Sequence, residues 1–149
     1  MRRAEQVVCA ASQLMMDVDI GTPAAVGVDA VEITDFGRDV EDVGDAFLTQ
    51  CFSAAEIKYC AGDVEKLATR FALKEAALKV LGTGIRGIGL HDIEVDTAVS
   101  GEPQLRLSAA AQSVATARKL GQLCCSATRE AGLAIAVVTA GPAPNEEKL

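Results

Sequence analysis

Two carboxylates stand in segments that are otherwise apolar. Asp29 lies inside residues 24–33 (AAVGVDAVEI), whose Val and Ile content predicts a strand, an element in which aspartate is depleted. Glu75 falls within the apolar stripe of a helix predicted for residues 63–81. A hard divalent cation such as Mg²⁺ would explain both, because it binds one or two protein carboxylates and completes its shell with water and phosphate.

Each carboxylate also has a simpler interpretation. Glu75 and Lys79 have the i,i+4 spacing of an ion pair whose charged ends both reach solvent. Asp29 fits the end of a strand or a bulge, where its side chain would accept a hydrogen bond from a nearby backbone amide. For each residue taken alone, the sequence leaves these alternatives open.

Cations and glycines close to Glu75 favour phosphate chemistry. The same helix carries the basic residues Arg70, Lys74 and Lys79. A glycine-bearing loop, residues 82–84 (GTG), follows directly, and alone it predicts only a helix cap and a turn. Carboxylates, cations and an approachable backbone together are the parts of a phosphate-transfer site.

The elements that must position these residues follow from periodicity and from helix-capping signals. Helical segments are predicted over 34–61, with Thr34 capping the first and a capping box at Ser53 and Glu56 starting the second. Asp63 suits the N-cap of the helix over 63–81, and Ser108 starts a further helix that ends at Gly121. Further strands are predicted at 90–96, 104–107, 123–128 and 132–140.

This order of elements predicts one α+β domain with a largely antiparallel sheet on a long central helix. Residues 1–23 are interpreted as an N-terminal extension, residues 24–140 as the domain, and residues 141–149 as a polar C-terminal tail.

Composition excludes several classes of protein. The 149 residues carry a net charge of −7, which argues against a general binder of nucleic acid or of anionic membranes. No segment approaches the ~20 apolar residues of a membrane span. The five cysteines and single histidine lack zinc-site spacing, so we expect buried thiols in a soluble protein of the reducing cytoplasm.

Two segments resemble the signatures of the holo-acyl-carrier-protein synthases. Residues 26–33 (VGVDAVEI) are similar to the family pattern G-[IV]-D-x-V-E-I. Residues 70–84 (RFALKEAALKVLGTG) closely resemble R-F-A-x-K-E-A-x-x-K-x-x-G-T-G, a pattern too long to match by chance. Weaker matches follow in order at 92–95 and 101–107, so the resemblance covers roughly residues 25–140.

The resemblance implies a 4′-phosphopantetheinyl transferase fold and a mechanism. Asp29 and Glu75 would hold Mg²⁺ on the pyrophosphate of coenzyme A, while a serine hydroxyl of an apo carrier protein attacks the β-phosphate and 3′,5′-ADP leaves. Lys79 would neutralise charge on the phosphates, and Glu75, or a water it holds, is the expected proton acceptor. The implied catalytic residues are therefore Asp29, Glu75 and Lys79.

The resemblance also implies where coenzyme A binds and what the chain assembles with. Arg70 would meet the 3′-phosphate, in a homotrimer with sites at the subunit interfaces. Pro103 would lie against the adenine, and the loop at 82–84 would border the pantetheine. The full set expected to bind coenzyme A is Arg70, Lys74, Lys79, Gly82, Thr83, Gly84, Pro103 and Thr128. The partner would be an apo acyl carrier protein or a carrier domain of a synthase.

The sequence departs from the family pattern in two places. Ala127 stands where the family usually has a histidine at the nucleotide end, although Thr128 remains and Arg129 offers a replacement charge. The helix after the first strand is acidic, with Arg38 its only cation, whereas bacterial members dock an acidic carrier there through arginines. An unusual partner, docking through another face, and a merely solvated helix all remain open.

Two alternatives to catalysis are open, and these departures motivate the first of them. One is a non-catalytic paralogue that acts as a carrier-binding or assembly module, and the other is a regulator that binds coenzyme A or a nucleotide. Intact Asp29, Glu75 and Lys79 favour the enzyme, because a degenerate enzyme usually loses its metal carboxylates. Turnover of an apo carrier separates the enzyme from both alternatives.

Overall fold

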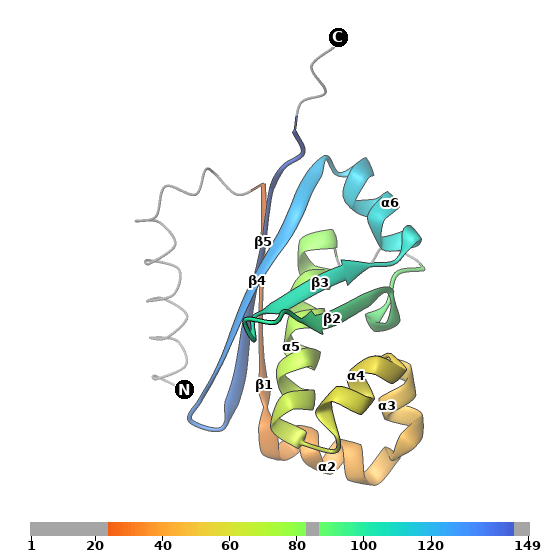
Figure 1. Cartoon of the computed structure of the whole chain (residues 1–149), viewed down its shortest axis with the longest axis vertical. Coiled ribbons are helices and arrows are strands. Elements are labelled where there is room, and N and C mark those ends of the chain that lie inside the picture. The colour runs from red at the N-terminus through yellow and green to blue at the C-terminus, as the bar shows by residue number, and fades with distance from the viewer. Residues whose placement is uncertain (1–23, 83–86, 145–149) are drawn as a thin grey trace.

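The computed structural model describes residues 24–82 and 87–144. Strands β1 (Ala25–Glu32), β5 (Leu133–Pro142) and β4 (Leu120–Glu130) form an antiparallel sheet in the order β1-β5-β4. The long helix α5 (Val64–Leu81) packs along one face of this sheet (Figure 1). The predicted α+β class, with its antiparallel sheet and long helix, is confirmed. The extension at 1–23 and the end of the tail at 145–149 lie outside the described residues.

Helix α5 is the centre of the core because ten of its side chains, from Leu67 to Leu81, are buried. Asp63 caps its start by accepting a hydrogen bond from the Lys66 amide, and Gly82 ends it with φ of 93°, as the sequence predicted. Its alanines at 68, 72, 76 and 77 are fully buried, and these small side chains let the sheet approach closely. At Gly27 of β1, a Cβ would lie 2.0 Å from the carbonyl oxygen of Ala76.

Three short helices precede α5 where the sequence predicted two helical segments. They are α2 (Ile33–Val43), α3 (Asp45–Cys51) and α4 (Ala54–Cys60). Gly44, with φ of 68°, separates the first two. The expected cap at Thr34 is wrong, because the side chain of Glu32 caps α2 by accepting the Asp35 amide at 2.6 Å. The capping box of Ser53 and Glu56 is confirmed.

A hairpin and a last helix cover the remaining part of α5. Helix η1 (Leu90–Asp92) leads into β2 (Ile93–Thr97), which pairs with β3 (Pro103–Leu107). Helix α6 (Ala109–Ala117) starts at Ser108 as predicted but ends before Gly121, since Lys119 adopts a positive φ of 57° and turns the chain into β4. Strand β4 therefore begins earlier than expected.

The cysteine prediction holds for part of the described chain. Cys51 and Cys60 are buried free thiols, whereas Cys124 is exposed on β4 and contradicts the expectation. Its neighbour Cys125 points the other way, where burial raises its thiol pKa to about 11. No helix among the described residues is long and apolar enough to cross a membrane.

Candidate active site

Asp29 lies in regular sheet rather than at a strand end or a bulge. β1 pairs with β5 in unbroken register, with Asp29 opposite Ala136. Because alternate residues share a face, Asp29 lies on the same face as the buried Gly27, toward α5. Its Oδ1 accepts a hydrogen bond from Lys79 Nζ at 2.7 Å, and the same ammonium donates to the Val28 carbonyl at 2.7 Å.

Glu75 faces the same strand from α5. Burial raises the pKa of its carboxyl, the nearby Asp29 raises it further, and Lys79 partly opposes both effects. Within the residues that the structure describes, no hydrogen bond to the Glu75 carboxylate lowers its pKa. The solvent-facing Glu75–Lys79 pair is thus not what forms, because Lys79 reaches back to β1 and pairs with Asp29.

The geometry therefore joins Asp29, Glu75 and Lys79 at the β1–α5 contact. Asp29 is a partly buried carboxylate with one oxygen paired to Lys79, and Glu75 is a half-buried carboxylate that is costly to ionise. No group of three or more His, Cys, Asp or Glu side chains with metal-site geometry occurs among the described residues. A pair of carboxylates nevertheless fits Mg²⁺, which takes its other ligands from phosphate and water.

Arg70 and Lys74 do not share the face of α5 that carries Glu75 and Lys79. At about 100° per residue, Lys74 projects about 100° and Arg70 about 140° around the helix from Glu75. Arg70 is only 7% exposed, and its guanidinium lies 4.0 Å from the ring centre of Tyr59 while donating to Thr97 Oγ1 at 2.8 Å. Within one chain, the structure does not bring Arg70 to the carboxylates.

Lys74 is fully buried, which changes its interpretation. Its Nζ lies 2.6 Å from Glu56 Oε2 and 2.6 Å from the Cys51 carbonyl oxygen. An ammonium enclosed in this way cannot reach a ligand without breaking a buried ion pair. The expectation that Lys74 binds coenzyme A is therefore not supported by its position.

Thr128 lies on the face of the sheet opposite to Asp29. Residues 127 and 128 alternate, so Ala127 packs toward the core opposite Ala136, and Thr128 is exposed on the outer face opposite Ile135. Arg129, expected to replace the missing charge, lies 3.4 Å from Glu65 at the far end of the sheet.

The loop and hairpin positions are described only in part. Gly82 caps α5, while Thr83 and Gly84 lie outside the described residues. Pro103 starts β3, and its carbonyl oxygen accepts from Cys125 Sγ at 3.3 Å, which ties the hairpin to β4.

Sequence reasoning missed two residues that shape the site. Gly27 belongs to the motif at 26–33, and a glycine inside a strand is a signal of close backbone approach. Glu56 was assigned only to a capping box. Its full burial carried no signal in the sequence, because capping glutamates are ordinarily exposed.

The comparisons with known proteins decide the family. The model of the 4′-phosphopantetheinyl transferase superfamily matches residues 25–138. The chain belongs to this superfamily. The matched range includes Asp29, Glu75 and Lys79. With relatives named holo-[acyl-carrier-protein] synthase, the predicted resemblance and enzyme class are confirmed.

Relatives named holo-[acyl-carrier-protein] synthase align with well over half of this chain. A holo-[acyl-carrier-protein] synthase of Roseiflexus castenholzii is 46% identical over 101 residues, which are 64% of this chain and 73% of the relative. One of Geobacter sp. is 39% identical over 116 residues, or 75% of this chain and 93% of the relative. The fold resembles the Helicobacter pylori enzyme in complex with coenzyme A, with a TM-score of 0.70 and 31% identity, covering 78% of this chain and 99% of that one.

Proposed function

We propose that this chain transfers the 4′-phosphopantetheine arm of coenzyme A to a serine of an apo acyl carrier protein, with Mg²⁺, and releases 3′,5′-ADP. The convergence of Asp29, Glu75 and Lys79 within the matched domain carries the proposal. The solved Helicobacter pylori relative contains coenzyme A, which supports coenzyme A as the donor.

The chain's own residues would divide the work at the reacting phosphates. Asp29 and Glu75 would hold Mg²⁺, which when bound neutralises phosphate charge and orients the pyrophosphate. Glu75, whose burial raises its pKa, is suited to accept the serine proton as the new oxygen–phosphorus bond forms. Lys79, 42% exposed and already at the Asp29 carboxylate, would offset charge on the departing 3′,5′-ADP as the pyrophosphate bond breaks.

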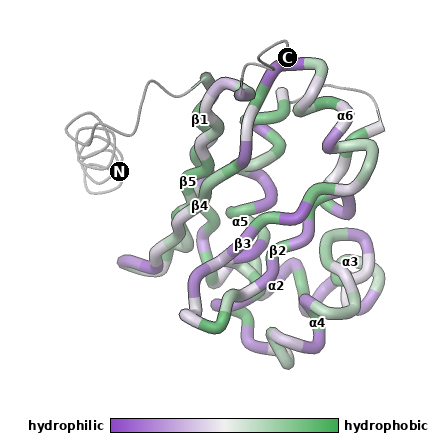
Figure 2. The backbone as a smooth tube through the Cα atoms, turned by 45° about the horizontal axis from the view of Figure 1, so that its top comes forward, coloured by the Kyte–Doolittle hydropathy of each residue, from purple (hydrophilic) through white to green (hydrophobic). Residues whose placement is uncertain are grey.

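A homotrimer would complete the binding site. Arg70 and Thr128 lie away from the carboxylates in one chain, so neighbouring chains would supply them. The outer face of the sheet offers an apolar surface for this, with Val26 49% exposed and Val28 and Val137 half-buried beside it. Figure 2 shows hydrophobic colour along most of β5 and hydrophilic colour at the β4–β5 turn.

The acidic surface of α2 affects where a carrier protein could dock. Asp35, Asp39, Glu41 and Asp42 are exposed, and Arg38 is tied to Asp35 at 2.8 Å. An acidic carrier would be repelled from this face. The carrier would therefore dock elsewhere or present a less acidic surface, as a carrier domain of a synthase can.

Intact-mass spectrometry of candidate apo carriers tests the proposal. With coenzyme A and Mg²⁺, the carrier should gain the mass of one phosphopantetheine arm, and EDTA should prevent the gain. Binding of coenzyme A without any mass gain across several carriers would instead favour the non-catalytic module.

A further inference from the structure

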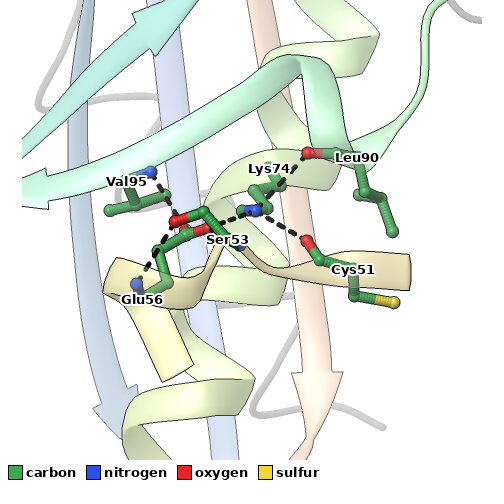
Figure 3. A network of polar contacts seen from close by, with 6 residues as sticks. All are labelled: Cys51, Ser53, Glu56, Lys74, Leu90 and Val95. Carbon is green, nitrogen blue, oxygen red and sulfur yellow. Dashed lines mark hydrogen bonds and ion pairs between the residues drawn. The ribbon is translucent and has the colours of Figure 1, made fainter. Parts of the chain in front are cut away.

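Lys74 and Glu56 form a fully buried ion pair between α5 and α4 (Figure 3). The side chains are each 1% exposed, and Nζ lies 2.6 Å from Oε2. Burying two charges in this way is costly unless the remaining donors and acceptors are also satisfied.

The surrounding contacts satisfy both groups. A lysine ammonium has three donors, and Nζ meets Glu56 Oε2, the Cys51 carbonyl at 2.6 Å and the Leu90 carbonyl at 3.4 Å. Glu56 also accepts from the Ser53 amide at 2.8 Å and the Val95 amide at 3.0 Å. Lys74 therefore has no donor free for a ligand.

The pair connects α5 to α3, α4, η1 and β2. Cys51 ends α3, Ser53 caps α4, Leu90 begins η1, and Val95 lies in β2. Apart from Arg70, the other buried side chains of α5 are apolar. Such contacts alone hold the rotation about the helix axis less strictly than directional bonds do. These side chains are Leu67, Ala68, Ala72, Leu73, Ala76, Ala77, Val80 and Leu81. Hydrogen bonds are directional and do fix this rotation.

We propose that the Lys74–Glu56 pair is a positioning unit that sets the rotation of α5 and thereby aims Glu75 at Asp29. Glu75 follows Lys74 directly and projects about 100° around the helix from it, so rotation of the helix moves the two side chains together. The inference deepens the proposed function and rests on it for the role of Glu75. Lys74 itself is a positioning residue and touches no substrate.

The test removes both charges at once. Losing one partner would strand a buried charge and risk unfolding, whereas a neutral pair is tolerated more often. The variant is therefore Glu56→Gln with Lys74→Met, beside the single changes. Glu65→Gln serves as the matched control, because it breaks only the exposed pair between α5 and Arg129.

A positioning role predicts a split between kinetic constants. The folded double variant should lose roughly tenfold to hundredfold in kcat, as a small misplacement of a catalytic group does, while its KM for coenzyme A stays near wild type. Mn²⁺ binding with coenzyme A present, followed by electron paramagnetic resonance, should weaken by about tenfold. Glu65→Gln should change neither quantity.

Other outcomes overturn the proposal. A raised KM with unchanged kcat would make Lys74 a coenzyme A ligand, and wild-type kcat with wild-type Mn²⁺ binding would make the pair irrelevant to Glu75. If the wild-type chain transfers nothing, the proposed function fails. The Mn²⁺ comparison still decides the positioning role in that case.

Discussion

Replacing Gly27 with alanine should separate β1 from α5 and thereby disable the site. The new Cβ would lie 2.0 Å from the Ala76 carbonyl oxygen, 3.0 Å from its carbon and 3.1 Å from Val80 Cγ2. An ordinary contact begins at 3.4 Å, so the oxygen is too close by about 1.4 Å. Helix backbone cannot move aside as a side chain does, and β1 is held by its pairing with β5.

The cost follows from overpacking. Inserted methyl groups in a well-packed core typically cost about 1–3 kcal/mol, and contact with backbone places Gly27→Ala at the upper end. For a chain of this length, 1 kcal/mol corresponds to roughly 3–4 °C in Tm, so we expect a loss of about 10 °C. Because Asp29 lies on the same face of β1 as Gly27, kcat should fall as well, by about tenfold or more.

Thermal unfolding and initial transfer rates check this prediction against a matched control. Gly141 lies in the same sheet, and a Cβ there would meet nothing within 4 Å. Gly141→Ala should leave Tm and rate near wild type. If Gly27→Ala matched this control in both measurements, the close approach of β1 to α5 would be wrong.

Further predictions concern charge and the nucleotide. Burial raises the pKa of Glu75, so ionisation of Glu75 destabilises the metal-free fold as pH rises through that pKa. Glu75→Gln should therefore be more stable than wild type at pH 7. The difference in their free energies of unfolding, measured by denaturant titration, should shrink toward pH 4. Hydrogen bonds from the Ser108 hydroxyl and then from the Gly89 amide lower the pKa of Asp92. Asp92 therefore stabilises the fold above its ordinary pKa of 3.8, and this stabilisation is lost as pH falls below that value. Asp92→Asn should lower the free energy of unfolding by about 1–3 kcal/mol at neutral pH and by progressively less in acid. Arg70→Ala should raise KM for coenzyme A far more than for dephospho-coenzyme A, and equal losses in paired kinetics would make Arg70 structural.

The sequence predicted the elements better than their junctions. The long helix from Asp63 to Gly82 and the strand holding Asp29 follow from strong local signals, namely capping residues and runs of Val and Ile. The start of α2 did not follow from local signals, because Glu32, which caps α2, is also the last residue of strand β1. The turn at Lys119 was missed because a positive φ at lysine has no composition signal.

For the site, sequence spacing identified which residues matter but not which way they face. Asp29 and Glu75 stood out as carboxylates among apolar residues, and the structure puts them together. Lys74 looked equivalent to Lys79 as a cation near Glu75, yet a difference of about 140° around the helix places it in a buried pair with Glu56. Tertiary neighbours decide such outcomes, and local sequence does not contain them.

We propose that Asp29 and Glu75 act together in metal-dependent transfer at one site. The most direct measurement is the initial rate of carrier modification against Mg²⁺ concentration for wild type, Asp29→Ala and Glu75→Ala, with circular dichroism confirming that each variant is folded. Both variants should lose nearly all transfer at every Mg²⁺ concentration while remaining folded, because neither carboxylate holds the core together. A variant that modifies its carrier at the wild-type rate would contradict the assignment of both carboxylates to the metal site.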